Sequence, residues 1–345
     1  MPSANLIDRS LTLLTDRIHT MPILVLFPHS RCNCRCIMCD IWRGNDQLVE
    51  IRTEQVRSNM NEIRKLGVKW VLLSGGEALM HQGIFDICKL FRDEGLRVTV
   101  HSTGLLLEKF AAEIVEHCTD LIVSLDGSPP VHDAIRNLPG GFAKLSNGVS
   151  AVQSVSSDFP ISARCVIQKA NFRDLPNIIE TARVLRLGQI SFLGADVSSQ
   201  AFNRQDGWND ARSETVTLTQ SEVSEFRHIL AEVIDANQDS FASGFVAESP
   251  EKLTRIVEYY AAVNGQGDFP KVRCNAPWVS SVVEADGTVR PCFFHESLGN
   301  INSNTLDEIL NSKAAIRFRK QLKVSADPIC RRCVCSLNLG PRARV

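Results

Sequence analysis

The chain has 345 residues, 44% hydrophobic and 22% charged, which is typical of a folded globular protein and excludes a disordered or collagen-like chain. Lys and Arg number 38 and Asp and Glu 39, so the net charge of −1 gives no indication of a nucleic-acid partner. No apolar run approaches the ~18–20 residues of a membrane helix, and the N-terminus lacks a signal-peptide core, so we expect a cytoplasmic protein with no membrane partner.

Strand and helix patterns alternate along residues 22–196. Continuous apolar runs predict buried strands, and the segments between them have helical periodicity, which indicates βαβ units and a parallel sheet. The strands are predicted at 23–27, 70–77, 97–104, 121–127, 161–168 and 189–196. Six strands are too few for a closed eight-stranded barrel. We therefore predict an α/β fold, a partial (βα)6 parallel barrel, with its ligand site at the carboxyl ends of the strands.

The remaining chain is predicted to form a polar loop, two helices and a small module. The loop covers 197–215 and the helices cover 218–237 and 249–263. In the module, residues 280–294 predict a hairpin that turns at Asp286–Gly287, and residues 305–322 predict a helix. The expected parts are a barrel core at 1–215, a helical connector at 216–273 and an α+β cluster-binding module at 274–345.

Cysteines are concentrated near both ends of the chain. Cys32, Cys36 and Cys39 follow the first predicted strand. Three thiolates at this spacing can hold three irons of a cubane cluster and leave the fourth iron open to a ligand. The alternative is a zinc site that uses Cys32 or Cys34 with Cys36, Cys39 and His29.

Two further motifs follow later strands. Ser74-Gly75-Gly76-Glu77 ends the second strand, where the glycines let the backbone approach a ligand and Glu77 supplies a carboxylate. Ser124-Leu125-Asp126-Gly127 ends the fourth strand. Arg136, which follows it, can bind a carboxylate in bidentate fashion.

The three motifs, in this order, resemble those of the radical SAM enzymes over roughly residues 20–200. The resemblance implies a [4Fe–4S] cluster at the three cysteines, whose open iron binds the amino and carboxylate groups of S-adenosylmethionine. Gly75, Gly76 and Glu77 would hold the amino group, and Ser124 and Arg136 would contact the methionine end. Reductive cleavage would give a 5′-deoxyadenosyl radical that abstracts hydrogen from a substrate.

The sequence departs from this family at three places. Met38 stands where members often carry an aromatic residue against adenine. Ser102-Thr103-Gly104 stands where many members have Thr-Asn-Gly, so the asparagine that contacts the ribose is missing here; Ser102 is a candidate cofactor-binding residue. Cys34 is an extra thiol, interpreted as a non-ligand because no other pairing restores the family spacing.

Cys274, Cys292, Cys330 and Cys333 form the second concentration of cysteines. Four thiolates can close a complete tetrahedral or cubane site, and a structural zinc ribbon is the alternative. The pattern resembles the twitch or short SPASM module of radical SAM enzymes, which implies one auxiliary iron–sulfur cluster, expected to be [4Fe–4S]. Cys335 is either a bystander or a replacement for Cys333.

Lys169 and Asp196, near the ends of the fifth and sixth strands, are candidate catalytic residues that contact substrate or accept a proton. The favoured function is hydrogen abstraction from a small molecule (a sugar, aminocyclitol, nucleotide or natural-product intermediate) by an oxidoreductase or related enzyme. The product would arise by oxidation, epimerisation or rearrangement, and flavodoxin or ferredoxin would donate electrons.

Two other functions remain open. The first is a radical SAM maturase that modifies a ribosomally made peptide. Many maturases carry a leader-binding domain before the cysteine triplet, whereas only 31 residues precede Cys32, which favours the small molecule. The second is a non-enzymatic interaction protein that binds zinc.

Overall fold

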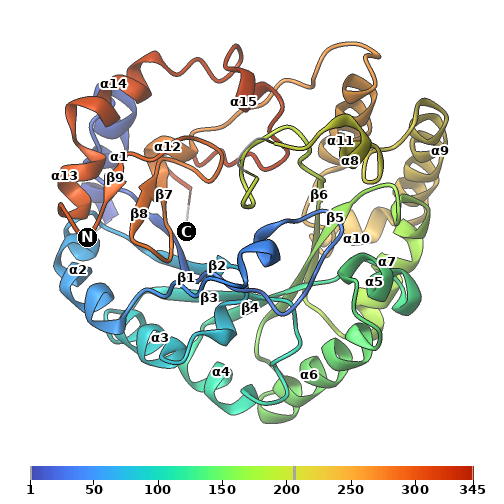
Figure 1. The fold of residues 1–345 in the computed structure, drawn as a ribbon, viewed down its shortest axis with the longest axis horizontal. Helices are drawn as coiled ribbons and strands as arrows, with labels where there is room; N and C mark the ends of the chain where they lie inside the picture. Colours follow the sequence, from blue (N-terminus) through green and yellow to red (C-terminus); the bar gives the residue numbers. More distant parts are fainter. Residues whose placement is uncertain (1, 205–206, 344) are drawn as a thin grey trace.

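The computed structural model describes residues 2–204, 207–343 and 345. One nine-stranded sheet runs through these residues in the order β6-β5-β4-β3-β2-β1-β7-β8-β9 (Figure 1). Its strands are β1 Ile23–His29, β2 Trp70–Gly75, β3 Arg97–Ser102, β4 Asp120–Ser124, β5 Ile161–Ile167, β6 Gln189–Gly194, β7 Ser280–Val283, β8 Thr288–Arg290 and β9 Gly299–Asn300. The six predicted strands are confirmed as β1 to β6, all paired in parallel, and the partial barrel is confirmed with them.

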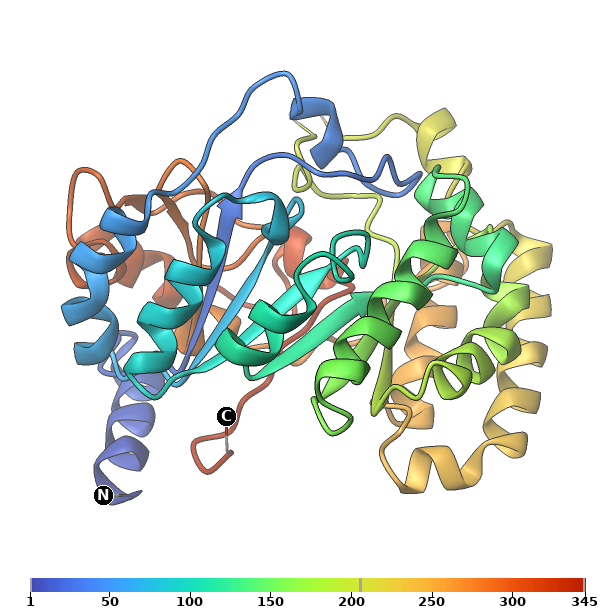
Figure 2. The ribbon, with the colours of Figure 1, turned by 90° about the horizontal axis from the view of Figure 1, so that it is seen from below.

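The helices α2 to α7 lie around the outside of this sheet (Figures 1 and 2). Their bounds are α2 Thr53–Lys65, α3 Ile84–Asp93, α4 Ala111–His117, α5 Pro129–Arg136, α6 Gly141–Val155 and α7 Leu175–Val184. Short 3-10 helices occur at η1 Ile41–Gly44, η2 Ala78–Met80 and η3 Phe172–Asp174. The main hydrophobic core lies between the strands and these helices, as expected for βαβ units.

Each inner strand presents alternate side chains to the core and to the barrel interior, which decides what can reach a ligand. In β5, Ala163, Cys165 and Ile167 are buried, whereas Arg164 and Val166 are less buried and line a cavity inside the barrel. The sequence of β5 therefore places one guanidinium inside the barrel.

The helices of the connector fix the end of β6. These helices are α8 Asp210–Glu214, α9 Gln220–Ala236, α10 Gln238–Ala242 and α11 Pro250–Val263. Helices α9 and α11 begin at N-caps Thr219 and Ser249, as their sequences predict. The Tyr260 hydroxyl, from α11, accepts a hydrogen bond from the Ala195 amide at 2.9 Å and donates one to the Ile167 carbonyl. The chain after β6 is thus held in one position. Residues 205–206 of the predicted polar loop lie outside the described residues.

The C-terminal module continues the barrel sheet. β7 pairs in parallel with β1, from Ile23 opposite Ser280 to Leu26 opposite Val283. The predicted hairpin is confirmed as β7 and β8, and Gly287 takes the positive φ that the turn requires. Helices α12 Ala276–Val279 and α15 Pro328–Arg331 lie beside the two ends of the module's cysteine set. One sheet contains strands from both sides of residue 274, so the sheet does not divide the barrel core from the C-terminal module. The domain boundaries at 215/216 and 273/274 therefore stay predictions.

Two helical assignments differ from the sequence analysis. The helix expected over 305–322 is two helices, α13 Leu306–Leu310 and α14 Lys313–Gln321. Ser312 separates them because its hydroxyl accepts a hydrogen bond from the Ala315 amide and begins α14. Helix α1 Pro2–Thr15 was not predicted. Among the helices of the described residues, each is too short or too polar to cross a lipid bilayer.

Candidate active site

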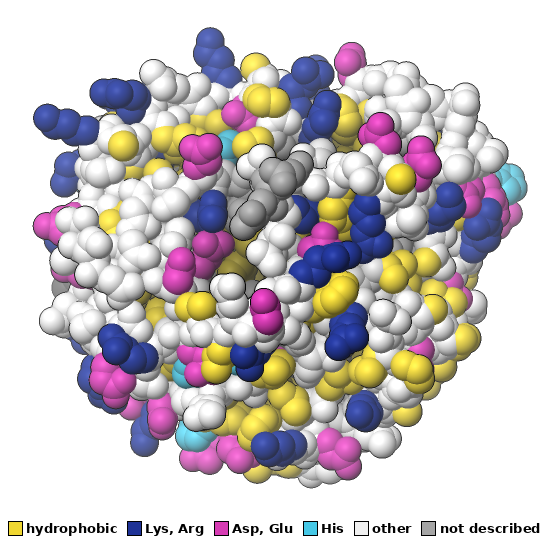
Figure 3. Space-filling view, in the orientation of Figure 1, with side chains coloured by type: hydrophobic (Ala, Val, Ile, Leu, Met, Phe, Trp, Pro, Cys, Tyr) yellow, Lys and Arg dark blue, Asp and Glu magenta, His cyan; other side chains and the backbone are white. Residues whose placement is uncertain are grey.

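The strand ends and the C-terminal module enclose a cavity of about 400 Å³, here called the inner cavity. It shares Phe27, Gly76, Phe202 and Phe293 with a second space of about 820 Å³, here called the outer chamber. Figure 3, drawn in the orientation of Figure 1, shows that the molecular surface is hollowed near the middle of the face in view. The two spaces therefore adjoin and give a path from solvent to the barrel interior.

Most predicted site residues line the inner cavity, although they come from both ends of the chain. The predicted residues along its wall are Cys32, Cys36, Met38, Cys39, Gly75, Gly76, Ser102, Ser124, Arg136, Asp196, Cys274, Cys292, Cys330 and Cys333. Glu77 and Lys169 are not among the lining residues. The structure thus brings the two cysteine sets to one space.

The loop that carries the first three cysteines is fixed at both ends by hydrogen bonds. Asn45 binds Cys32 twice, accepting from its amide at 3.0 Å and donating to its carbonyl at 2.8 Å. The amides of Arg35 and Ile37 donate to the carbonyls at the end of α5. Backbone hydrogen bonds therefore position the segment that carries the thiols.

The chain after β6 also contacts this loop. Arg204 donates to the Met38 carbonyl at 2.9 Å, and Arg212 donates to the Ile37 carbonyl at 2.6 Å. The indole of Trp208 donates to Asp40. Sequence analysis gave none of these three a role in holding the cysteine loop. No sequence motif marks these three residues, because each donates a hydrogen bond to a single carbonyl or carboxylate that is more than 160 residues away in the sequence.

The thiols of the triplet have different electrostatic surroundings. Burial raises the pKa of Cys32 and of Cys39 to about 12. A hydrogen bond with Cys34 lowers the pKa of Cys36, and Arg136 acts in the same direction from 3.5 Å. Arg136 is therefore placed to stabilise a thiolate at Cys36 before any metal binds.

The Gly75–Gly76 turn lies against the cysteine loop. A Cβ atom at residue 76 would lie 2.1 Å from the Arg31 carbonyl oxygen, so only glycine fits there. The Glu77 amide donates to the same carbonyl at 2.9 Å. The Glu77 carboxylate is fully buried and accepts from Thr103 and from the Leu79 amide, with a pKa that burial raises. In this structure the Glu77 carboxylate therefore holds the segment after β3 and does not face the cavity.

Arg136 forms a buried ion pair with Asp126 at the end of the SLDG motif. Asp126 is 0% exposed, and its other oxygen accepts from the Val166 amide at 3.0 Å. The Nε atom of Arg136 is buried and has no partner among the described residues. The pair fixes the guanidinium at the cavity wall and leaves donors for a ligand.

His132 is buried and His101 is half-buried at the cavity wall, and both rings are neutral. Burial lowers the pKa of His101 to about 3 and that of His132 to about 4. In the unfolded chain both have pKa values near 6.5. Between these values the unfolded state binds more protons than the native state, so the native state loses stability as the pH falls.

We expect the free energy of unfolding to fall between pH 6.5 and pH 5 by up to about 1.4 kcal/mol per pH unit for each histidine. Anaerobic urea denaturation at several pH values measures this slope. His132→Gln and His101→Gln should each reduce it. A slope in both variants equal to that of the wild type would show that these histidines do not cause it.

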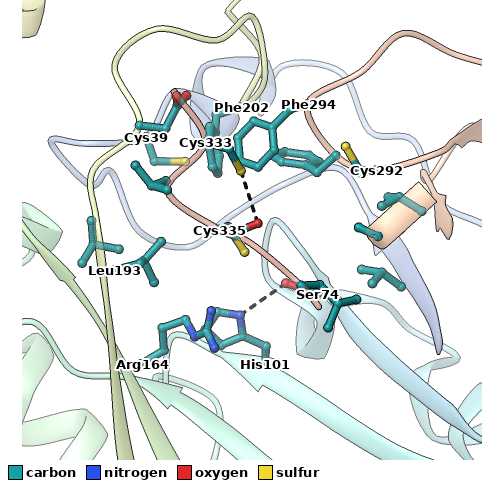
Figure 4. A pocket seen from close by; sticks show the side chains of 18 of the residues that line it. Cys39, Ser74, His101, Arg164, Leu193, Phe202, Cys292, Phe294, Cys333 and Cys335 are labelled. Atoms are coloured by element: carbon teal, nitrogen blue, oxygen red, sulfur yellow. Dashed lines mark hydrogen bonds between the residues drawn. The ribbon is translucent and has the colours of Figure 1, made fainter. Parts of the chain in front are cut away.

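The C-terminal thiols surround the other side of the cavity. Cys274, Cys292, Cys330, Cys333 and Cys335 all line it, and the Cys333 thiol donates to the Cys335 carbonyl at 3.3 Å (Figure 4). The structure therefore keeps both Cys333 and Cys335 within reach of one site.

Side chains other than thiols also approach this set. His295 Nε2 lies 3.3 Å from the Cys330 sulfur. Within the part of the chain that the structure describes, His295, Asp327 and Cys330 bring three ligand atoms within 4.8 Å of one another. The sequence analysis did not single out His295 or Asp327.

The two candidate catalytic residues have different positions. Asp196 lies at the cavity wall, ion-paired with Arg204 at 3.0 Å and bound by the Ser199 hydroxyl. Lys169 lies outside the cavity, 3.7 Å from the Glu222 carboxylate. The structure places Asp196 in the site and does not bring Lys169 to it.

Two family models match the chain. The radical SAM superfamily model matches residues 26–182, and the SPASM iron–sulfur cluster-binding domain matches residues 274–334. The chain belongs to the radical SAM superfamily. Its barrel and its C-terminal SPASM-like module correspond to the two matched regions.

Among curated proteins, this radical SAM enzyme is 25% identical to the Fe-coproporphyrin III synthase of Methanosarcina barkeri, over 93% of this chain and 84% of that protein. It is 21% identical to the sporulation killing factor maturation protein SkfB of Bacillus subtilis, over 85% of this chain and 65% of that protein. SuiB of Streptococcus suis, solved with S-adenosylmethionine and with its precursor peptide SuiA, matches with TM-scores of 0.64 and 0.63. That match has 10% identity and covers 95% of this chain and 75% and 74% of SuiB, so it shows the fold alone.

The cofactors of such an enzyme are S-adenosylmethionine, a [4Fe–4S] cluster and an auxiliary cluster, and the donor sets fit them. The two family matches account for both cysteine sets as cluster sites of a radical SAM enzyme, so the non-enzymatic zinc protein is not supported.

Proposed function

We propose that this radical SAM enzyme modifies a peptide by removing hydrogen from a residue held in the inner cavity. The observation that carries the proposal is that both cysteine sets line this one cavity, which adjoins the outer chamber. A substrate group in the inner cavity would face both sets, while the rest of a chain could occupy the outer chamber.

The residues of the first site have these proposed roles. Cys32, Cys36 and Cys39 hold the cluster, which with S-adenosylmethionine bound supplies the radical that takes hydrogen from the substrate. The backbone at Gly75–Gly76 binds the amino group of the methionine end, and Arg136 with Ser124 binds its carboxylate. Ser102 and Met38, which also line the cavity, would contact the nucleoside.

The Glu77 carboxylate has a supporting role in this proposal. Its two oxygens are already bound by Thr103 and Leu79, so it fixes the turn that carries Gly75 and Gly76. Asp196, which is ion-paired with Arg204 at the cavity wall, is the proposed acceptor for a substrate proton. Lys169 is left out because it lies outside the cavity.

The second cysteine set gives the enzyme a place to send an electron. Cys274, Cys292, Cys330 and Cys333 would fill all four positions of an auxiliary cluster and leave none for a substrate. We therefore assign electron transfer to this site. After hydrogen abstraction, loss of one electron to this site and one proton to Asp196 would leave a peptide oxidised by two electrons overall.

The peptide is favoured over the small molecule that the sequence analysis preferred. The outer chamber of about 820 Å³ adjoins the inner cavity, and its wall includes the loop Ser198–Arg204 and the turn around Asp286. A substrate the size of a sugar or an aminocyclitol would leave this space empty. SkfB is by name a maturation protein, and SuiB was solved with a precursor peptide.

A tetrapyrrole is a second candidate. The match to Fe-coproporphyrin III synthase extends over 93% of this chain and 84% of that protein. A ring system of this size would also use both spaces.

The test uses anaerobically reconstituted enzyme with S-adenosylmethionine and an electron donor such as flavodoxin or ferredoxin. Short peptides encoded beside the gene are supplied one at a time, and an iron tetrapyrrole that is a precursor of Fe-coproporphyrin III, the product for which the relative is named, is supplied separately. We expect 5′-deoxyadenosine to form in step with a peptide that loses two hydrogens. Cys292→Ser should still cleave S-adenosylmethionine without yielding that peptide. Turnover of the tetrapyrrole, with no peptide changed, would contradict the proposal.

A further inference from the structure

We infer that Arg164 and His101 form a subsite for a substrate carboxylate at the floor of the inner cavity. The inference rests on the proposed function, in that the carboxylate would belong to an acidic side chain or the C-terminus of the peptide. Figure 4 shows the two side chains next to each other, across the cavity from Cys39, Cys333 and Phe202.

The strands place these two residues deeper in the barrel than the cysteine loop. His101 is on β3 and Arg164 is on β5, so they flank β4, where Ser124 pairs with Arg164. Arg164 lies within β5, whereas the three cysteines follow the end of β1. A group that reaches Arg164 must therefore enter the barrel beyond the level of the cysteine loop.

Arg164 lacks the counter-charge that the other cavity arginines have. Arg136 is paired with Asp126, Arg204 with Asp196 and, at the outer chamber, Arg290 with Glu284. The guanidinium of Arg164 makes no ion pair or hydrogen bond among the described residues, and its Nε atom is buried. Only the Nε atom of this guanidinium is buried, so its Nη groups are open to the cavity and can bind a ligand carboxylate, the counter-charge that the described residues do not supply.

His101 supports a carboxylate without competing for it. Its two ring nitrogens lie 3.4 Å from the hydroxyls of Ser74 and Ser124. Because its pKa is lowered to about 3, the ring stays neutral and adds no charge of its own. Ser124 is assigned to the cofactor, so the Ser74 hydroxyl, 3.4 Å from the ring, is the one that can rotate to donate to a substrate carboxylate.

The rest of the cavity selects for an apolar body on this acid. Phe293 packs edge-on against Phe27 and Phe202, with ring centroids 5.2 Å and 4.8 Å apart, respectively. The remaining lining includes Val25, Leu72 and Val166. A carboxylic acid with an aromatic or aliphatic body could therefore bind Arg164 through its carboxylate and contact the apolar walls with the rest of the molecule.

The experiment compares 3-phenylpropionate with 3-phenylpropionamide, which differ in charge and have nearly the same shape. Calorimetric titrations use the reconstituted holoenzyme with S-adenosylmethionine bound and no reductant. We expect the acid to bind about tenfold or more tightly than the amide, as for a charge-assisted hydrogen bond. Arg164→Gln should remove this preference, Arg164→Lys should keep part of it, and Arg97→Gln should leave it unchanged. Arg97 is a matched control because it is paired with Asp120, outside the cavity.

Two results would overturn the subsite. One is equal binding of acid and amide by the wild type. The other is an Arg164→Gln variant that loses affinity for S-adenosylmethionine, because Arg164 would then bind that cofactor's carboxylate. Iron content equal to that of the wild type shows that the variant is folded.

The source of the carboxylate is tested separately. The same variants are titrated with acetyl-Phe-Glu-Phe-amide, with its Gln counterpart and with Fe-coproporphyrin III. A preference for the Glu peptide that depends on Arg164 supports both the subsite and the peptide. Arg164-dependent binding of the tetrapyrrole alone would support the subsite and contradict the peptide substrate.

Discussion

The variant Cys32→Ala/Cys36→Ala/Cys39→Ala is expected to hold about four irons per chain after anaerobic reconstitution, where the wild type holds about eight. It should lose S-adenosylmethionine cleavage completely. The reason is that the three thiols are the only proposed ligands of the open cluster, while the C-terminal thiols remain intact on the far side of the cavity. Iron and sulfide analysis, with chromatography of 5′-deoxyadenosine, measures both results.

The matched control is Cys274→Ala/Cys292→Ala/Cys330→Ala, which should lose the other four or so irons and still cleave S-adenosylmethionine. A Cys34→Ala variant should keep all of its iron, because Cys34 is interpreted as a non-ligand. If the wild type held only about four irons, all lost in the first variant, the electron-transfer role of the second site would be wrong.

Replacing Arg136 by Met is expected to destabilise the protein by about 3–5 kcal/mol, the cost of leaving one partner of a buried ion pair. Asp126 is 0% exposed and would keep its charge without a counter-ion or would have to bind a proton. The variant should also lose affinity for S-adenosylmethionine, because Arg136 is the proposed partner of its carboxylate. Anaerobic urea denaturation and equilibrium binding measure the two effects.

The double variant Arg136→Met/Asp126→Asn separates these two effects. It removes both charges, and the side-chain amide introduced at position 126 has a carbonyl oxygen that can still accept from the Val166 amide. We expect the double variant to recover most of the lost stability and none of the cofactor affinity. If Arg136→Met alone were as stable as the wild type, the ion pair would contribute nothing to folding.

The parallel barrel could be predicted because each of its strands is a local pattern. Continuous apolar runs bounded by glycine, such as the one that ends at Gly75, fix both the strand and the loop after it. The cysteine triplet, the two glycines and Arg136 are also local motifs, and the fold brings them to one cavity. Sequence motifs were therefore sufficient to predict a strand or a site residue wherever one short segment contains the whole motif.

The sequence could not predict contacts between distant segments. Arg204 and Arg212 bind single carbonyls of the cysteine loop, and no sequence pattern marks such a pair. Glu77 was expected at the ligand, but Thr103 and Leu79 occupy its oxygens once the chain folds. In the sequence, Arg164 is one polar residue in a strand of alternating pattern. Only the structure shows that its guanidinium has no ion-pair or hydrogen-bond partner among the described residues.

The pairing of β1 with β7 also sets an order for assembly during synthesis. β1 is among the first strands to leave the ribosome, and its partner is near the end of the chain. Until β7 emerges, one side of β1 has unpaired amide and carbonyl groups, which is the kind of edge that pairs with other chains. Such a late, long-range parallel pairing forms slowly. The nascent enzyme should therefore be most prone to aggregation after β1 has emerged and before β7 is made, and iron supplied in that interval would meet a cavity that still lacks one wall.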